Sequence, residues 1–244
     1  MLYLYTDFGW HGPYVGEVKA VLARAQSATP MIDLMHDAPQ FNPLASGYLL
    51  AALSQQFQSG DYCLAIVDPG VGNAARRPLV MSADGITYVG PDNGLFGVIA
   101  TSARTCMCSE ILWRPEQMSA SFHGRDLFAP VMAMEIAAQA YAKRQVDIEE
   151  LVGYGGPASL REVIYIDGYG NCITGQRADE LSTDSILSVN GVSVAYARIF
   201  SMAEKDMLFW YVNSLGLVEI ACNQDNAAAR LGLSIGLPFE FRQG

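Results

Sequence analysis

The chain has 244 residues, of which 51% are hydrophobic, and a formal net charge of −10 at pH 7. This length and apolar content suffice for one large domain or two smaller domains, each with its own core. The acidic balance argues against a nucleic-acid partner, because binding to phosphate backbones depends on clustered Lys and Arg side chains. No apolar run approaches the roughly 20 residues that span a bilayer, so we expect no membrane partner.

The cysteines and the N-terminal segment predict a cytoplasmic location. The five cysteines are odd in number and lie mostly in apolar, strand-like segments, which suits reduced thiols better than disulfides. The segment "MLYLYTDFG" lacks the basic region and following apolar region of a secretory signal. The pair "CMC" at 106–108 has no second ligand pair at a usable spacing, so no metal site is expected.

In the first part of the chain, strand-like and helix-like segments alternate. Runs of β-branched and aromatic residues predict strands, and apolar residues repeated at three and four positions predict helices. In chain order these are a strand at 2–5, helices at 13–25 and 43–57, strands at 62–67, 78–82 and 86–89, and a helix at 127–144. Such alternation predicts an α/β domain with a largely parallel sheet.

The pattern changes after the Gly- and Pro-rich segment "VGYGGPAS" at 152–159. Short strand-like segments separated by turns then follow, at 162–167, 185–191, 192–200, 207–213 and 217–222. This pattern is typical of a barrel or compact sandwich. We therefore predict an α/β domain over residues 1–156 and a smaller all-β, barrel-like domain over residues 157–244.

Three polar segments follow predicted strands of the α/β domain: "TDFG" at 6–9, "DPGVG" at 68–72 and "GPDNG" at 90–94. In an open α/β sheet, ligands bind outside the carboxyl ends of the strands. Asp and Gly are also ordinary turn residues, so each segment alone is a weak signal. Their recurrence at one expected sheet edge favours a binding site there.

Charged residues near two of these segments are candidates for catalysis. Asp68 ends an apolar strand and is followed closely by Arg76 and Arg77, which a hairpin does not require. His123 lies in "SFHGRD", with a glycine beside it and charged neighbours, and is the best catalytic candidate among the three histidines. His11 is most simply a surface residue, and a local turn explains His36 as well as a catalytic role does.

Seven segments, in this order, resemble the S-adenosylmethionine (SAM) hydroxide adenosyltransferase family, which is related to the SAM-dependent chlorinases and fluorinases. The resemblance covers nearly the whole chain. The segments are "TDFG…PYVGEVK", "IDLMHDAPQF", "VDPGVG…RRP", "YVGPDNGL", "FHGRDLFAPV", "IDGYGNCIT" and "NSLGLVEIACNQDNAAARLG".

The resemblance implies an α/β domain, a C-terminal β-barrel domain, and a homotrimer with active sites between the N-terminal domain of one subunit and the C-terminal domain of its neighbour. It implies that water or hydroxide attacks the ribose C5′ of SAM, giving adenosine and L-methionine, without a metal or cofactor. It also implies a side-chain triad that holds the water, matched here by Asp68, Arg76 and His123. The loop carries one residue more than the usual family loop, which leaves Arg77 as the alternative to Arg76.

For the substrate, the resemblance implies that Asp7 takes the ribose hydroxyls and that Phe41 flanks the nucleoside. It implies that Asp167 faces the methionine ammonium, that Tyr169 stacks, and that Asn171 binds adenine. Tyr169 stands where the family usually has Phe.

The C-terminal segment of the family contacts the methionine end and the adenine. The matching residues are Ser214, Asn226 and Ala227. Two departures concern the methionine end: Gly12 stands where many relatives have Asp, and Leu215 where some have Arg.

Three alternative functions remain open on the sequence. A SAM-dependent halogenase is disfavoured because a carboxylate at Asp68 repels a halide. A non-catalytic adenosine- or SAM-binding protein remains compatible with the altered loop before Arg76 and with Gly12. A metal-dependent phosphohydrolase that uses Asp7, Asp92 and His123 as well as Asp68 leaves the barrel motifs unexplained.

Overall fold

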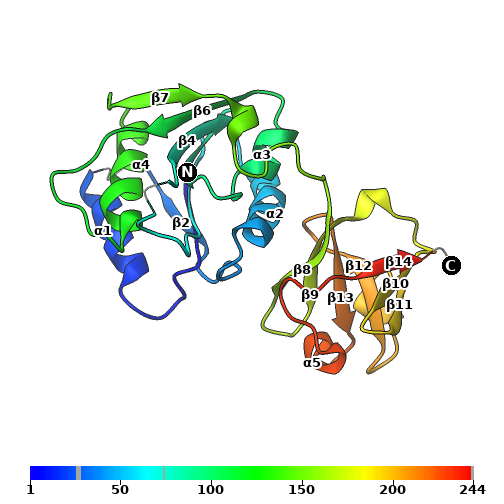
Figure 1. Ribbon diagram of the computed structural model, residues 1–244. Coiled ribbons are helices and arrows are strands. Elements are labelled where there is room, and N and C mark those ends of the chain that lie inside the picture. The colour runs from blue at the N-terminus through cyan, green and yellow to red at the C-terminus, as the bar shows by residue number, and fades with distance from the viewer. Residues whose placement is uncertain (26–28, 74, 243–244) are drawn as a thin grey trace. The chain divides into compact units, whose positions relative to one another are not determined.

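The computed structural model describes residues 1–25, 29–73 and 75–242. The chain divides into two compact units, drawn in Figure 1. The first comprises Met1–Gly47 and Gln56–Gly156, and the second comprises Tyr48–Gln55 and Pro157–Gly244. In the described part of the chain, no helix combines the length and the apolar character needed to cross a membrane.

The first unit contains a mixed seven-stranded sheet in the order β2-β1-β3-β5-β4-β6-β7. Its first four strands pair in parallel, and the β5-β4, β4-β6 and β6-β7 pairs are antiparallel. The strands are β1 (Leu2–Thr6), β2 (Met31–Met35), β3 (Tyr62–Ile66), β4 (Pro78–Ala83), β5 (Ile86–Pro91), β6 (Cys106–Ile111) and β7 (Lys143–Val146). The predicted α/β class is confirmed, and the parallel strands form the half of the sheet that carries the predicted site.

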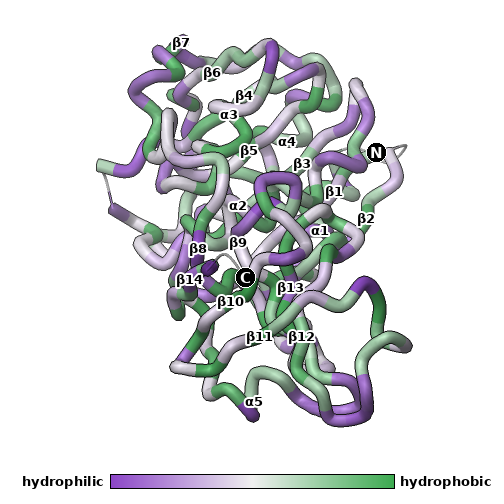
Figure 2. Tube along the Cα trace, turned by 90° about the vertical axis from the view of Figure 1, so that its right-hand side faces the viewer, coloured by the Kyte–Doolittle hydropathy of each residue, from purple (hydrophilic) through white to green (hydrophobic). Residues whose placement is uncertain are grey.

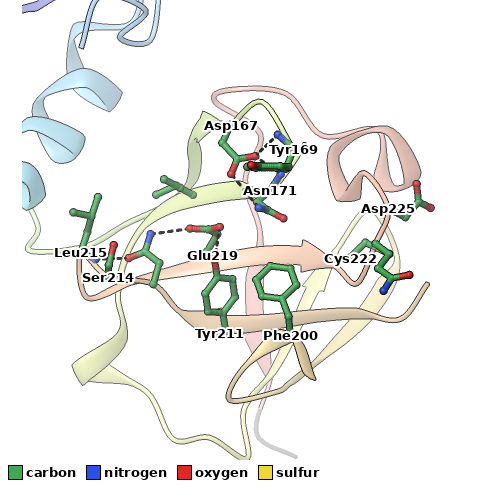
Figure 3. Close-up of a pocket in the computed structure, with 13 residues that line it drawn as sticks. Asp167, Tyr169, Asn171, Phe200, Tyr211, Ser214, Leu215, Glu219, Cys222 and Asp225 are labelled. Atoms are coloured by element: carbon green, nitrogen blue, oxygen red, sulfur yellow. Dashed lines mark hydrogen bonds between the residues drawn. The ribbon is translucent and has the colours of Figure 1, made fainter. Parts of the chain in front are cut away.

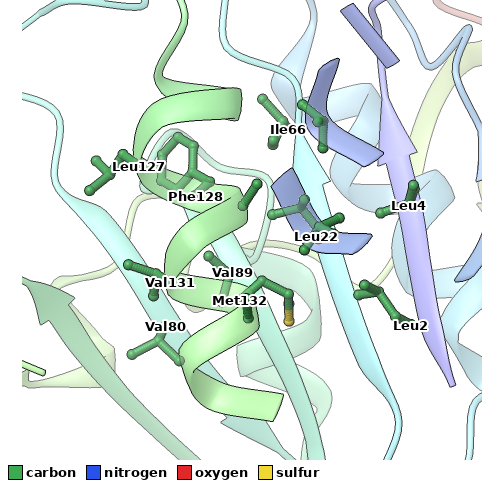
Figure 4. Close-up of a cluster of buried hydrophobic side chains, with 14 of the residues drawn as sticks. Leu2, Leu4, Leu22, Ile66, Val80, Val89, Leu127, Phe128, Val131 and Met132 are labelled. Atoms are coloured by element: carbon green, nitrogen blue, oxygen red, sulfur yellow. The ribbon is translucent and has the colours of Figure 1, made fainter. Parts of the chain in front are cut away.

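Helices flank this sheet. They are α1 (Tyr14–Ala25), α3 (Gly97–Ser102) and α4 (Ala129–Ile136), while helix α2 (Pro43–Leu53) is divided between the two units. Helices α1 and α4 pack on one face, where buried side chains such as Leu4, Leu22 and Met132 interdigitate (Figure 4). Burying each such side chain contributes about 1.5–3 kcal/mol, so this layer fixes β1 and β3. The loops that follow these strands therefore leave the sheet from rigid positions.

The helix expected over 127–144 is wrong in its C-terminal half. A π-helical turn at Gly124–Phe128 leads into α4, which ends at Ile136. Ala138 has φ +50°, a left-handed conformation that a right-handed helix cannot contain. Lys143 instead begins strand β7 and forms an ion pair with Glu135 at 2.7 Å. Pairing with the β6 edge therefore outweighs the helix propensity of the alanines.

The second unit contains seven strands in the order β14-β10-β11-β12-β13-β9-β8. They are β8 (Leu160–Ile166), β9 (Cys172–Arg177), β10 (Ile186–Val189), β11 (Val192–Tyr196), β12 (Leu208–Val212), β13 (Leu217–Cys222) and β14 (Glu240–Arg242), with a short helix α5 (Ala227–Leu231) before β14. The sheet curls until the Val163 N–H of β8 donates to the carbonyl of Leu237, just before β14, at 3.0 Å. The predicted barrel-like, all-β class is confirmed.

Buried hydrophobic side chains on the strands of the second unit form its core. Figure 2 shows hydrophobic residues concentrated in strands such as β13 and hydrophilic residues in loops. Strands β12 and β13 pair in regular antiparallel register from Leu208↔Cys222 to Val212↔Val218. Trp210 of β12 is 1% exposed, and its indole N–H donates to the Ser185 carbonyl at 3.0 Å.

Trp210→Ala is expected to destabilise the second unit by about 3–5 kcal/mol, because it leaves a large cavity and an unpaired carbonyl. The urea midpoint followed by circular dichroism measures the change. Trp10→Ala is the matched control, since Trp10 is 58% exposed. Equal shifts for the two variants contradict the assignment of Trp210 to the core.

Candidate active site

The carboxyl ends of β1, β3 and β5 bring the three predicted polar segments together. The Asp7 N–H donates to the Ile66 carbonyl at 3.4 Å, which places the loop after β1 beside the end of β3. The Asn93 side-chain amide donates to the Val67 carbonyl at 2.8 Å, which joins the loop after β5 to the same point. Asp68 follows directly. The sheet edge predicted from the sequence is therefore where these loops converge.

Asp68 forms an ion pair with Arg76, whose Nη1 donates to the Asp68 carboxylate. Both side chains are largely shielded, with 8% of Asp68 and 22% of Arg76 exposed. A Cβ at position 70 would lie 2.7 Å from the Arg76 guanidinium, so a larger residue there would displace the end of the arginine side chain. Residue 74 of this loop lies outside the described residues.

Arg77 is committed to other partners. It donates to Asp92 at 2.7 Å and to Glu150 at 3.0 Å. Asp92 also accepts the Val152 N–H, so this pair fixes the loop after β5 to the segment after β7. Of the two adjacent arginines, Arg76 is the one that meets Asp68.

His123 precedes the π-helical turn and is held near the same edge through Gly124. A Cβ on Gly124 would lie 3.1 Å from Phe8 and 3.3 Å from Ile66, so the backbone approaches these two residues closely. Burial lowers the pKa of His123, and nearby Arg114 lowers it further. The imidazole is therefore neutral at pH 7 and able to accept a proton.

Asp7 is partly buried, and burial raises its pKa to about 6. The loop that carries it is anchored by His36, for which a local turn was an equally good interpretation of the sequence. The His36 ring is buried, with Nδ1 2.8 Å from the Thr6 hydroxyl and Nε2 3.0 Å from Asp33. The His36 carbonyl also accepts the Gly9 N–H at 2.6 Å.

Phe41 lies in the loop before α2 with 80% of its surface exposed. Its φ of +58° is left-handed, a conformation that costs a bulky residue of order 1 kcal/mol or more. Nothing in the sequence signals this strain. A large aromatic side chain held exposed and strained is suited to contact a ligand or another chain.

The second unit contains a pocket of about 910 Å³ (Figure 3). Four predicted substrate residues line it: Asp167, Tyr169, Asn171 and Ser214. The Asp167 carboxylate accepts the N–H groups of Tyr169 and Asn171 at 2.9 Å, and the Asn171 amide at 3.0 Å. This hydrogen bonding holds the "IDGYGN" turn rigid and leaves the Tyr169 ring 83% exposed.

Glu219 lines the same pocket and was not predicted as a site residue. It is 5% exposed on β13 and accepts hydrogen bonds from the Tyr211 hydroxyl at 2.6 Å and the Asn213 amide at 2.9 Å. Burial raises the pKa of Glu219. The signal in the sequence is a single acid within the apolar segment "LVEIAC".

Asn226 and Ala227 are not among the residues that line this pocket. Asn226 caps α5 by accepting the Ala229 N–H at 2.7 Å. The Ala228 N–H donates to the Gly170 carbonyl at 2.9 Å. These contacts tie α5 to the turn that carries Asp167. In the described part of the chain, no group of three or more His, Cys, Asp or Glu side chains is arranged to hold a metal ion.

Comparison with known proteins identifies the family to which the chain is similar. Residues 2–145 match the SAM hydroxide adenosyltransferase N-terminal domain, and residues 161–240 match the C-terminal domain. A Thermus thermophilus protein named (R)-S-adenosyl-L-methionine hydrolase is 32% identical, and the match covers 97% of each chain. A Salinispora arenicola protein of the same name is 33% identical over 95% of this chain and 93% of its own.

Solved structures agree with this similarity. An uncharacterized conserved protein from Thermotoga maritima superposes with a TM-score of 0.84 at 28% identity and covers 99% of this chain and 100% of its own. A conserved hypothetical protein from Thermus thermophilus has a TM-score of 0.78 at 33% identity and covers 99% of both chains. The chain therefore belongs to the SAM hydroxide adenosyltransferase family, as its seven sequence segments indicate.

Proposed function

We propose that the protein hydrolyses SAM by attack of water at the ribose C5′, giving adenosine and L-methionine. The observation that carries this proposal is the shielded Asp68–Arg76 ion pair at the carboxyl edge of the sheet. Relatives at 32% and 33% identity that are named (R)-S-adenosyl-L-methionine hydrolases support it. By extension from these names, we propose the (R) configuration at the sulfonium.

In this reaction the water oxygen forms a bond to C5′, and the C5′–S bond breaks with its electron pair passing to sulfur. The leaving group is a sulfonium, so it needs no protonation, and the chemical demand is for an oriented nucleophile in line with the C5′–S bond. Arg76 favours negative charge on the attacking oxygen. The water proton passes to Asp68 or to neutral His123, each of which is a proton acceptor at pH 7.

Substrate contacts are proposed for the residues that match the family segments. Asp7 accepts both ribose hydroxyls, since an ionised carboxylate is acceptor-only. Phe41 and Tyr169 offer exposed rings to the nucleoside. Asp167 faces the methionine ammonium, and Asn171 offers an amide edge to adenine. Ser214 contacts the methionine end, with Asn226 and Ala227 completing the adenine side.

Halogenation is the competing chemistry. A halide beside Asp68 would meet a like charge, a repulsion of roughly 4 kcal/mol for a 4 Å separation and an effective dielectric constant of about 20, which Arg76 offsets in part. The Asp68–Arg76 pair thus favours a neutral nucleophile that becomes hydroxide-like only as it reacts.

Incubation with SAM in ¹⁸O-labelled water tests the proposal. Adenosine with ¹⁸O at the 5′ oxygen is expected, together with methionine, from the (R) epimer and not from the (S) epimer. Chloride is added in a parallel reaction, where a 5′-chloro product assigns the protein to the halogenases. Binding of SAM or adenosine without turnover assigns it to the non-catalytic binding proteins.

We propose that the reaction needs no cofactor, and that the protein acts in the cytoplasm. The cationic leaving group supports the first proposal, since it removes the need for Lewis-acid activation. Five free cysteines support the second, because reduced thiols suit a reducing compartment. Dialysis against EDTA is expected to leave the rate unchanged. A rate lost on dialysis and restored by a divalent metal contradicts cofactor independence.

We propose a homotrimer whose active sites combine Asp68 of one subunit with Asp167 of its neighbour. The exposure of Phe41 and Tyr169, 80% and 83%, supports burial of these rings in an assembly. Asp68→Asn and Asp167→Ala proteins, each nearly inactive, are co-refolded in equal amounts. The mixture is expected to recover roughly a quarter of wild-type activity, because random closed trimers pair two intact halves at about that frequency. Mixed oligomers, verified by native mass spectrometry, that stay inactive contradict shared sites.

A further inference from the structure

The pocket of the second unit presents two unbalanced negative charges. Asp167 and Glu219 line it, and within the described chain neither forms an ion pair. A third acid of the pocket, Asp225, has Arg230 at 3.7 Å. The pocket lining contains no Lys, Arg or His among the described residues. A ligand that fills this pocket therefore meets net negative charge.

Neutral donors hydrogen-bond both carboxylates. Asp167 accepts two backbone N–H groups and the Asn171 amide. Glu219 accepts hydrogen bonds from the Tyr211 hydroxyl and the Asn213 amide, and Figure 3 shows Glu219 and Tyr211 below Asp167. Hydrogen bonds to a carboxylate stabilise its charge without cancelling it. A cationic ligand group supplies the missing counter-charge.

Leu215 and Ser214 lie together at one end of the pocket (Figure 3). The Asn213 side-chain oxygen accepts the Leu215 N–H at 2.9 Å, so that backbone donor is already used. Leu215 contributes an apolar side chain, and Ser214 a neutral hydroxyl. This end of the pocket therefore has no charged group to pair with a carboxylate.

Three cations beside the predicted substrate loops of the first unit already have carboxylate partners. Arg76 pairs with Asp68, and Arg125 pairs with Glu17 at 2.6 Å. Lys19 pairs with Asp33, 2.9 Å away. Pairing a substrate carboxylate with any of these cations would break an existing ion pair.

We propose that this pocket recognises the cationic end of an adenosyl sulfonium and gives the α-carboxylate of SAM no charged partner. The substrate class thus extends to adenosyl sulfoniums that carry an amine but whose carboxylate is absent or esterified. Glu219 is the specificity residue, acting with Asp167 on the ammonium. This inference rests on the proposed function, which it deepens at the methionine end.

The test compares kcat/KM for three substrates: SAM, its carboxyl methyl ester and its decarboxylated amine. Adenosine release is the readout. The two carboxylate-free substrates are expected to match SAM or exceed it by up to about tenfold, because they remove a negative charge from an acidic pocket. A preference for SAM of about 100-fold or more overturns the inference, since a site built to bind the carboxylate rejects analogues that lack it.

Calorimetric binding of the same three ligands keeps this inference separate from the proposed function. If no ligand is hydrolysed, the proposed function fails, and the order of the three Kd values still decides the question of the carboxylate. Affinities for the ester and the amine that equal or exceed that for SAM support the inference. A clear preference for SAM contradicts it.

Two variants move the preference in predictable directions. Leu215→Arg places a cation at the pocket end. It is expected to shift the ratio of kcat/KM for SAM to kcat/KM for the carboxylate-free substrates toward SAM by about tenfold. Glu219→Gln removes one negative charge and also shifts the ratio toward SAM. Tyr211→Phe is the matched control, because it removes a hydrogen bond to Glu219 and keeps the charge, so the ratio is expected to stay constant. Leu215→Arg alone decides the test if Glu219→Gln does not fold, and an unchanged ratio contradicts the proposal.

Discussion

Asp68→Asn is expected to lower kcat for SAM hydrolysis by about 10²–10⁴-fold, with the Kd for adenosine changed less than about threefold. The amide keeps the shape of the carboxylate and loses its charge, its ion pair with Arg76 and its ability to accept a proton. The substitution changes the contacts to the attacking water and not those to the nucleoside, so it lowers kcat and leaves the affinity for adenosine almost unchanged. Single-turnover kinetics together with calorimetry measures the two quantities.

The adjacent arginines supply a matched pair of controls. Arg76→Lys replaces the planar guanidinium beside Asp68 by a point charge and is expected to lower kcat by about 10–10³-fold. Arg77→Lys disturbs only the pairs with Asp92 and Glu150, so it is expected to lower stability and to change kcat by less than about threefold. The reverse order, with the larger kcat loss at Arg77, refutes the placement of Arg76 in the site.

The position of the site at the carboxyl edge of the sheet could be predicted from the sequence, because it depends on residues that are close together in the chain. Apolar strands followed by Asp and Gly define where the chain leaves the sheet, and parallel strands present these ends at one edge. Asp7 and Asp68 therefore converge as expected. The choice between Arg76 and Arg77 could not be made from the sequence, because it depends on Glu150, far along the chain, which pairs with Arg77.

Other features depend on contacts that a sequence pattern does not reveal. The alanine-rich segment has strong helix propensity, yet the strand pairing of Lys143–Val146 with β6 overrides it. Strand β2 was not predicted, because Asp33 interrupts its apolar pattern. That aspartate is needed there, since it binds both His36 and Lys19.

In the pocket, too, one side could be predicted from the sequence and the other could not. The turn from Asp167 to Asn171 follows from its own sequence, because an Asx-type carboxylate hydrogen-bonds the backbone just after it. Glu219 reads as one polar residue in a strand, and its place in the pocket appears only when β12 brings Tyr211 beside it. Buried acids in otherwise apolar strands are therefore the signal worth pursuing in sequences of this family.

Asp7→Asn is expected to raise stability and lower activity together. Burial raises the Asp7 pKa from its usual 3.8 to about 6, so ionisation costs the folded state free energy. Between about pH 4 and 6 the folded protein binds a proton that the unfolded chain has lost, and stability falls as pH rises through this window. Above pH 6 the whole penalty of about 1–3 kcal/mol is present. The neutral asparagine removes it, so the gain in thermal midpoint is expected at about pH 8 and is absent at about pH 4.

The activity of the same variant is expected to fall by about 10–100-fold in kcat/KM, because an amide replaces the charged acceptor of the ribose hydroxyls. In the wild type, KM is accordingly expected to rise as the pH falls below about 6, where Asp7 becomes protonated. Asp84→Asn is the control, with an effect on stability of opposite sign. Asp84 is exposed, accepts backbone N–H groups of Arg104 and Thr105, and has a lowered pKa, so its replacement is expected to destabilise the fold.

Two outcomes contradict the prediction for Asp7. If Asp7→Asn lowers the thermal midpoint at about pH 8, Asp7 is a structural residue. If it raises the midpoint at full activity, Asp7 is not a ligand of the ribose. Only a gain in stability combined with a loss of activity fits a carboxylate kept partly buried for a substrate.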